Sequence, residues 1–425
     1  MTKERRPQEI NYWASISPAA WVHRTPPTRA SEKSEMTPSF RRHRRLRPRP
    51  ASAPPLEDGD LLDEILLRLS PDPSSLPRAS AVCTRWRRLV SDPGFVGRFR
   101  LRHRRSPPIL GCFIRDKQSP VVSFVPTMEA PNRVPAERFS LQLGGRGPIT
   151  FLDCRHSLLL MFLPYWIKVL VWDPVTGDQH RLDIPPGFDT KQGIGGAVLR
   201  AAGAIRHFQV VLLGRDKQVI TACVYSSEAG VWGNLVSTPL PNEVPVDFDF
   251  RGVPVLIGDS LHYLITGVCS RILEFDLNKR ILTVIAGPVD ILDVGSCQST
   301  VMRAEDGGPG ILFKSDCNVQ LWRRKIDCDG QASWVLGRTF ELDTLLSLNS
   351  EEKEPTVMLG LAEYNNAVVV QTVAGHFMVQ LESLQFNKMY EASSWHFHQP
   401  FESVYTGETS IGGGGHNGAE LLHNT

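Results

Sequence analysis

Two short motifs carry residue types that could support chemistry. Gly193-Ile194-Gly195-Gly196 is rich in glycine, as phosphate-cradling loops are, but it lacks the third glycine spacing and the strand-to-helix context of a dinucleotide site. We interpret it as a tight turn between two repeat units. His396-Phe397-His398 could place two imidazoles on one side of a strand, as two metal ligands would require. No third ligand is identifiable, so we interpret these histidines as surface or packing residues.

Other enzymatic patterns are missing from the sequence. It contains no G-x-S-x-G elbow, no G-x-x-x-x-G-K-[ST] loop and no H-E-x-x-H. The 8 cysteines form no C-x-x-C pair, and in a chain of 425 residues they indicate reduced thiols of an intracellular protein. Asp173 and Asp276 are expected to cap turns through their carboxylates. We therefore predict no catalytic residues, no cofactor and no metal site.

Charge is distributed unevenly along the chain. Residues 1–55 hold 12 Lys and Arg against 4 Glu, whereas the remainder holds 35 basic and 41 acidic residues. The first segment is rich in Pro, Arg and Ser, so we expect a disordered leader. Its cluster Arg41-Arg42-His43-Arg44-Arg45-Leu46-Arg47 is typical either of a nuclear-import or nucleic-acid contact or of a solvated leader, and we favour the solvated leader. Met36 stands just before the cluster, and the sequence leaves open whether translation starts at Met1 or at Met36.

The chain shows no stretch that is long and apolar enough for a membrane. Its most apolar window, residues 157–172, is too short and is interrupted by Pro164 and Lys168. A strand, a turn and a second strand explain this window better. No signal peptide is visible in the first thirty residues. We therefore expect a soluble protein of the nucleus or the cytoplasm.

Residues 56–105 have helical character. Asp60 can cap a first helix over residues 61–69, and Pro71-Asp72-Pro73 ends it. Ser74 or Ser75 can cap a second helix from near Leu76, in which apolar residues recur every three or four positions up to Val90. Phe95 and Phe99 follow as packing anchors.

From about Pro107 the pattern changes to short strands. Runs rich in Val, Ile, Leu and aromatic residues alternate with Gly, Pro, Asp and Asn, and they predict strands near residues 121–125, 167–172, 208–213, 219–225, 255–257, 273–275, 281–285, 311–313, 319–322, 367–372 and 377–381. Only residues 341–348 favour a helix in this region.

The strands recur with a period near fifty residues. An aromatic residue followed by a polar turn marks five units, at Phe124, Trp172, Tyr225, Phe275 and Trp322, with spacings of 48, 53, 50 and 47 residues and a weaker sixth unit near Leu381. In the second and third units a glycine, Gly177 or Gly230, follows the aromatic by five residues, where a hairpin turn needs positive φ. The period favours a six-bladed kelch-like β-propeller over an irregular β-sandwich.

The first helix carries more leucine than its small module can bury. Its apolar residues occupy more than one helical face, and a unit of about fifty residues is marginal alone. The excess apolar surface must be covered either by the following domain or by a partner protein.

The helical segment resembles an F-box. The resemblance rests on Leu56-Glu57-Asp58-Gly59-Asp60-Leu61-Leu62-Asp63-Glu64-Ile65-Leu66-Leu67-Arg68-Leu69, on the Val82-Cys83…Trp86…Leu89 spacing and on Ser91-Asp92-Pro93-Gly94-Phe95. More narrowly, it resembles the F-box of grass proteins with a C-terminal F-box-associated, propeller-like region, and downstream segments including residues 171–177 and 332–346 share that likeness. The resemblance covers roughly residues 56–405.

The resemblance implies a substrate-recruiting subunit of an SCF-type cullin–RING ubiquitin ligase, which binds a Skp-family adaptor through the F-box and an unknown protein substrate through the propeller. Carried over by position, the adaptor-binding candidates are Leu56, Leu61, Ile65, Leu69, Leu76 and Pro77. The corresponding F-box core candidates are Leu62, Leu66, Val82, Cys83, Trp86 and Leu89. Glu57, Gly59, Asp63 and Ser70 depart from the family pattern. An unpaired buried Asp63 would cost several kcal/mol, so we expect its side chain to face solvent.

These observations predict an α+β multidomain chain. We expect a basic leader at residues 1–55, an F-box at 56–100, an all-β propeller-like substrate-binding domain at 101–406 and a flexible tail at 407–425, which includes the glycines 412–415. The alternative function is an interaction scaffold with a degenerate F-box, whose leader contacts nucleic acid or directs nuclear import. As partners we expect neither a membrane nor nucleic acid.

Overall fold

The computed structural model describes residues 58–115, 121–143, 149–190, 193–200, 207–241, 250–265, 270–288, 297–348, 356–390 and 397–407. The expected basic leader and the tail from residue 408 on lie outside these ranges. Residues 54–425 belong to one compact unit, which contains both the helices and the sheets.

Helices come first along this unit. They are α1 (Gly59–Leu66), α2 (Ser75–Ser80), α3 (Thr84–Val90) and α4 (Pro93–His103). We call residues 58–106 the helical module. The second predicted helix is in fact two helices, because the chain breaks at residues 81–83, where Cys83 is extended with φ −163° and ψ 170°.

Aspartates at the helix starts provide the caps. The carboxylate of Asp58, rather than that of the predicted Asp60, caps α1 by accepting from the amides of Asp60 and Leu61 at 2.9 and 3.3 Å. Asp92 caps α4 by accepting from the Phe95 amide at 2.8 Å. Ser74 precedes α2, as predicted, but its side chain makes no capping hydrogen bond. Each aspartate cap satisfies donors that the helix itself leaves unpaired.

Six antiparallel sheets follow within the described ranges. Blade 1 contains β25 (Phe397–Glu402), β1 (Ile109–Arg115), β2 (Val121–Pro126) and β3 (Leu141–Gln142), and blade 2 contains β4 (Thr150–Arg155), β5 (Leu158–Leu163), β6 (Lys168–Trp172) and β7 (Gln179–Asp183). Blade 3 contains β8 (Ile194–Arg200), β9 (Phe208–Asp216), β10 (Val219–Ser226), β11 (Val231–Trp232) and β12 (Val236–Pro239), and blade 4 contains β13 (Phe250–Ile257), β14 (Ser260–Ile265), β15 (Arg271–Asp276) and β16 (Ile281–Ala286).

The last two sheets complete the set. Blade 5 contains β17 (Gln298–Arg303), β18 (Pro309–Ser315), β19 (Asn318–Ile326) and β20 (Ala332–Glu341), and blade 6 contains β21 (Val357–Ala362), β22 (Ala367–Thr372), β23 (Gly375–Gln380) and β24 (Phe386–Tyr390). The short helices η1 (Ala136–Phe139) and α5 (Leu342–Leu346) lie in blade 1 and after blade 5.

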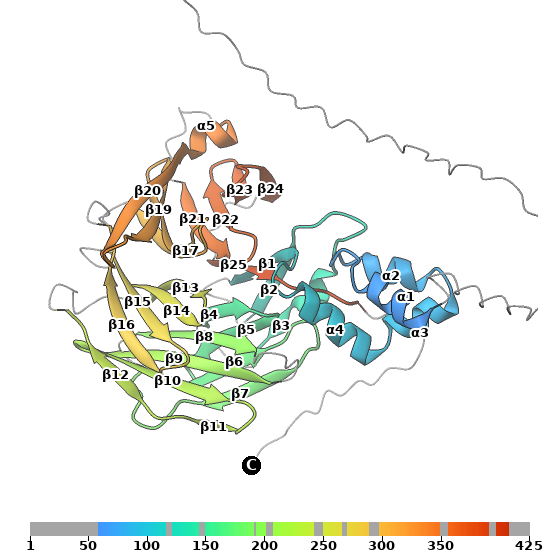
Figure 1. Cartoon of the computed structure of the whole chain (residues 1–425), viewed down its shortest axis with the longest axis horizontal. Coiled ribbons are helices and arrows are strands. Elements are labelled where there is room, and N and C mark those ends of the chain that lie inside the picture. Colours follow the sequence, from blue (N-terminus) through green and yellow to red (C-terminus); the bar gives the residue numbers. More distant parts are fainter. Residues whose placement is uncertain are drawn as a thin grey trace, which may run out of the picture. The chain divides into compact units, whose positions relative to one another are not determined.

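The first strand of each blade lies on the inside of a ring (Figure 1). These inner strands neighbour one another in the cycle β25, β4, β8, β13, β17, β21 and again β25. Blade 1 takes its inner strand from the C-terminal end of the described chain, since β25 pairs with β1. The prediction of a helical segment followed by an all-β six-bladed propeller is therefore confirmed.

The core lies between neighbouring blades. Separate apolar clusters join blade 1 to blade 2, blade 2 to blade 3, blade 3 to blade 4, and blade 4 to blades 5 and 6. The eleven predicted strand segments all fall within or overlap observed strands, and the predicted helix at residues 341–348 corresponds to α5. Continuous apolar runs marked the central strands, such as β5 and β22, because these strands bury side chains on both faces of their sheets.

The predicted glycine turns are confirmed. Gly177 and Gly230 adopt φ of 85° and 72° in the hairpins after β6 and β10. Their amides donate to the carbonyls of Asp173 and Ser226, each at 2.8 Å. In blade 4 a non-glycine residue, Arg280, takes the same place with φ of 58°.

The interpretation of Gly193-Ile194-Gly195-Gly196 as a turn is wrong. Residues 194–196 begin the inner strand β8, where space is limiting. A Cβ on Gly195 would lie 3.0 Å from the Phe250 ring, and one on Gly196 would lie 3.1 Å from the side chains of Leu152 and Leu160. Glycine is used here for close packing of inner strands.

Within the described ranges, no helix has the length and apolar character needed to cross a membrane.

Ring closure predicts the effect of one substitution. A Cβ on Gly360 of β21 would lie 2.3 Å from the backbone carbonyl oxygen of His398 in β25. Gly360→Ala should therefore lower the free energy of unfolding by about 1–3 kcal/mol, measured by urea titration. Gly233→Ala is the control, because its Cβ would meet its nearest neighbour at 3.4 Å. Equal stability of the two variants would contradict this account of the seam.

Candidate functional site

The exposed side of α1 carries two large aliphatic residues. Leu61 and Ile65 are 49% and 38% exposed, whereas Leu62 and Leu66 on the other side are fully buried. Leu61 and Ile65 are four residues apart and therefore adjacent on the helix surface. The sequence placed Leu61 and Ile65 on the adaptor face and Leu62 and Leu66 in the core, and the structure separates them in the same way.

The break between α2 and α3 corrects two core assignments. Val82 is 61% exposed and Cys83 is also exposed. The assignment assumed one continuous helix, in which both residues would share a face with Trp86. Because the chain leaves helical geometry before α3, both side chains are released to the surface. The guanidinium of Arg85 in α3 reaches the start of α1, where an added Cβ on Gly59 would lie 3.8 Å from it.

Leu76 requires the opposite correction, because it is buried in the core of the helical module. Helix α2 begins at Ser75, and this phase turns Leu76 and Ala79 inward while Pro77 is exposed. Leu69, Trp86 and Leu89 are partly buried and pack against the same core. Leu56 lies outside the described residues.

Asp63, one of the departures from the F-box pattern, is paired. Its carboxylate accepts from the guanidinium of Arg98 at 2.6 Å. Asp63 is partly buried and Arg98 is about half exposed, so this departure leaves no unpaired buried charge. Arg98 belongs to α4, and the pair therefore also ties α1 to α4.

The propeller completes the core of the helical module. Val404, two residues after β25, is buried in the same apolar cluster as Leu62, Leu66 and the α4 anchors Phe95 and Phe99. Nearby, the guanidinium of Arg100 donates to the Thr406 hydroxyl at 2.7 and 3.1 Å. The apolar surplus of the module is thus covered in part from within the chain, while Leu61 and Ile65 remain uncovered.

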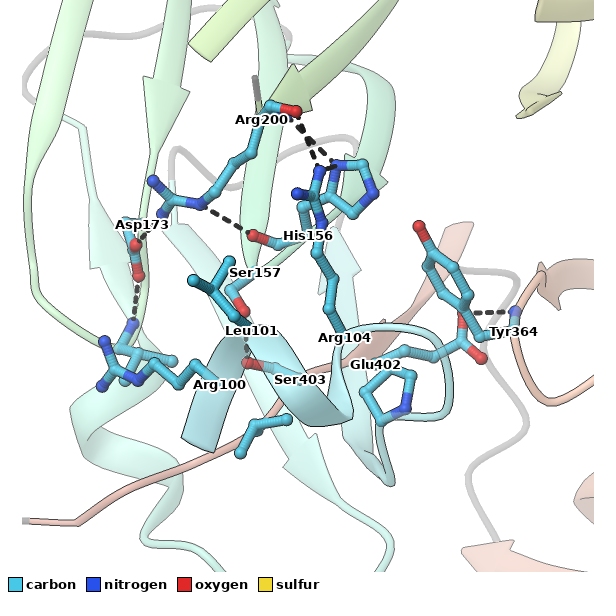
Figure 2. Close-up of a pocket in the computed structure, with 13 residues that line it drawn as sticks. Arg100, Leu101, Arg104, His156, Ser157, Asp173, Arg200, Tyr364, Glu402 and Ser403 are labelled. Carbon is cyan, nitrogen blue, oxygen red and sulfur yellow. Dashed lines mark hydrogen bonds and ion pairs between the residues drawn. The ribbon is translucent and has the colours of Figure 1, made fainter. Parts of the chain in front are cut away.

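A junction cavity lies where α4 meets the propeller (Figure 2). Asp173 pairs there with Arg200, and its Oδ1 also accepts from the amides of Val175 and Thr176 at 3.0 and 3.2 Å. The predicted turn-capping role of Asp173 is confirmed, and that of Asp276 likewise, since it accepts from the amides of Asn278 and Lys279 at 3.0 and 2.8 Å. The ion pair of Asp173 with another blade was not predicted.

Buried carboxylates line the inner ends of the blades. Burial raises the pKa of Asp153 to about 6, and the nearby Arg155 acts in the opposite direction. Arg155 pairs with Glu363 of blade 6 at 2.7 Å and donates to the Pro254 carbonyl of blade 4 at 2.5 Å. These contacts join blades 2, 4 and 6 across the ring, so we assign them a structural role.

Glu402 ends the closing strand β25. Its carboxylate accepts from the Asn365 amide at 2.7 Å and from the Asn365 side chain at 2.8 Å. Burial nevertheless raises its pKa to about 7. Sequence reasoning missed Glu402 and Glu363, because no local motif marks residues that meet only when the ring closes.

The histidine motif gives no metal site among the described residues. His396 lies outside them, and His398 is buried with its ring beside His376 and hydrogen-bonded to Tyr390. The described ranges hold no group of three or more His, Cys, Asp or Glu residues that could bind a metal ion. The seven cysteines in these ranges are free thiols.

The comparisons identify the helical module. Residues 59–96 match the F-box domain, which covers α1, α2, α3 and the start of α4. The chain thus contains an F-box domain, a type that generally binds Skp-family adaptors and occurs in proteins that are generally non-catalytic. No curated protein matches the chain.

Several solved structures share a distant likeness. A protein from Lactobacillus plantarum is 12% identical with a TM-score of 0.36, over 70% of this chain and 85% of that one. Apo AztD from Citrobacter koseri is 9% identical with a TM-score of 0.34, over 69% and 98%. Hydrazine synthase from Kuenenia stuttgartiensis is 10% identical with a TM-score of 0.35, over 64% and 78%. Likeness at this level carries no argument about function.

Glu402 predicts a pH dependence of stability. An unfolded glutamate has a pKa near 4.3, so the folded state binds more protons between about pH 4 and 7, and stability falls as pH rises through this window. The glutamine in the Glu402→Gln variant cannot ionise. Between pH 5 and 8 the free energy of unfolding of this variant should therefore fall by about 1–3 kcal/mol less than that of the unchanged protein. Urea titrations at several pH values measure this.

The matched control is Glu228→Gln, in an exposed turn. It should retain the pH profile of the unchanged protein. A Glu402→Gln profile with the same slope as the unchanged protein would contradict the raised pKa.

Proposed function

We propose that this chain, an F-box domain joined to a six-bladed propeller, is the substrate-recruiting subunit of an SCF-type cullin–RING ubiquitin ligase. The observation that supports this most directly is the exposed pair Leu61 and Ile65 within the F-box match. Single exposed aliphatic residues are common on proteins, but an adjacent pair on one helix of a small module forms an anchor for a partner.

The apolar surface around Leu61 and Ile65 would gain free energy if a partner protein covered it. Burial of the exposed parts of Leu61 and Ile65 would contribute about 1 kcal/mol each, so further anchors are required. Val82 and Pro77 are exposed on the same small module and extend the available apolar surface. Asp60, Glu64 and the arginines of α3 provide a charged rim, which suits an interface with an apolar centre.

The propeller's role in this proposal is to hold a substrate. The Val404 contact and the Arg100–Thr406 hydrogen bonds fix the helical module against the closing strand. A substrate bound to the propeller would be held at a defined place relative to the adaptor, and ubiquitin transfer would be accelerated by proximity. No catalytic residue of this chain takes part.

Finer features of the proposal rest on resemblance. The resemblance to grass F-box proteins and the kelch-like repeat support the same role. From this role we also propose that the protein is located in the nucleus or the cytoplasm. We also propose the domain limits expected from the sequence, with residues 1–55 as a leader outside the recruiting unit.

Adaptor binding is the direct test. The full-length protein should co-purify with a plant Skp-family adaptor, and the double substitution Leu61→Asp and Ile65→Asp should weaken this binding at least about 100-fold, because two charges would be buried at an apolar contact. The affinity is measured by surface plasmon resonance. The full chain is used because Val404 is part of the module's core.

The control replaces two aliphatic propeller residues that are more exposed than Leu61 and Ile65. Val231 and Ile281 are 60% and 51% exposed, and their conversion to Asp should leave adaptor affinity unchanged. If the unchanged protein does not bind the adaptor, the proposal is wrong and the interaction-scaffold function becomes the better explanation.

A further inference from the structure

A basic cavity opens on the propeller beside α4, with a volume of about 730 Å³. Its charged lining comes from the module and from blades 3 to 5, and among the described residues that line it the only carboxylate is that of Asp259. The basic cavity shares four lining residues with the junction cavity, and Figure 2 shows them: Arg104, His156, Arg200 and Tyr364. The arginines of the basic cavity are Arg104, Arg105, Arg200, Arg280 and Arg303.

Three of these arginines have no carboxylate partner among the described residues. Arg200 pairs with Asp173 and Arg303 with Glu363. Arg104 instead donates to the Arg200 carbonyl at 2.8 Å and contacts Nδ1 of His156 at 2.9 Å. Nη1 of Arg280 is buried without any hydrogen-bond acceptor. Arg105 is exposed at the rim.

The cavity is positive in a chain body that is acidic. After residue 55 the chain carries 35 basic and 41 acidic residues, so five arginines at one cavity are a local concentration. The effect is visible at His156, where burial first and then the charges of Arg104, Arg155 and Arg200 lower the pKa to about 2. A neutral imidazole can accept a hydrogen bond from Arg104 and adds no charge.

We infer that this basic cavity binds an acidic segment of a protein, one that presents at least two neighbouring carboxylate or phosphate groups. Guanidinium groups match both anions with paired hydrogen bonds, and Arg104, Arg105 and Arg280 line the cavity without a carboxylate partner among the described residues. The inference rests on the proposed function and names the chemical class of the substrate segment.

The lining favours a peptide over nucleic acid. Single-stranded nucleic acids are held by stacking on aromatic side chains, and among the described residues Tyr364 is the only aromatic ring that lines the cavity besides the imidazole of His156. The arginines come from the two residues after α4, from the ends of β8 and β17 and from the turn after β15, so several separate segments of the chain contribute positive charge to one cavity.

Fluorescence anisotropy with the full-length protein tests the inference. The probes are a labelled octaglutamate, a labelled glycine peptide with two phosphoserines, and a labelled octaglutamine as the neutral reference. At least one anionic peptide should bind, and its affinity should fall with added salt. Comparison of the two anionic peptides distinguishes carboxylate from phosphate, and tripolyphosphate is added as a small-molecule competitor.

Paired variants identify the site. Arg105→Glu with Arg280→Glu should weaken peptide binding at least about tenfold, because two charge-assisted contacts become repulsive. Arg181→Glu with Lys325→Glu changes the net charge equally on exposed strand residues outside the cavity and should leave binding unchanged. Thermal unfolding checks that all variants are folded. If the Arg105→Glu, Arg280→Glu double variant is not folded, the single variant Arg105→Glu replaces it in the binding experiment.

Each contrary outcome is distinct. Equal loss in both paired variants, or no loss in either, would overturn the inference, as would binding of tripolyphosphate without any peptide. Adaptor binding by the same preparations is measured in parallel and should not depend on Arg105 or Arg280. If adaptor binding fails while the acidic peptide still binds at the arginines, the proposed function falls and the anion site stands.

Discussion

One apolar cluster joins the helical module to the chain segment that follows the closing strand β25, and the rest of the structure depends on that contact. Four short helices cannot enclose all their leucines, and the chain resolves part of this shortage by inserting Val404, from the segment after β25, among Leu62, Leu66, Phe95 and Phe99. The strand that closes the ring therefore also anchors the helices. The apolar residues left outside this shared core, Leu61 and Ile65 first, are the ones available to another protein.

Closure of the ring has an electrostatic component as well. Arg155, Asp153 and Glu363 are buried at the inner ends of blades 2 and 6, and Glu402 terminates the strand that brings these ends together. Buried charges of this kind are costly unless paired, so their pairing helps to specify which blades meet. The same end of the propeller carries the junction cavity and the basic cavity, which places the arginines next to α4.

The sequence was sufficient for features that repeat or that follow from local spacing. Strand positions, the six-fold period and the Gly177 and Gly230 turns were predictable because each depends on residues close in the chain. The exposure of Val82 and Cys83 was not, because the hydrophobic pattern continues through a break in the helix. Arg155 and Glu363 lie about two hundred residues apart and share no motif, so their pairing is set by ring closure alone. The arginines of the basic cavity are scattered for the same reason.

Amide hydrogen exchange of the full-length protein, with and without a Skp-family adaptor, tests the central claim most directly. In the free protein we expect strong protection in β25 and in the helical segments that contact Val404. On addition of the adaptor, protection should increase in residues 59–66 and around residues 77–83, with little change in the propeller strands. Weak protection of the module in the free protein, or an adaptor effect confined to the propeller strands, would contradict it.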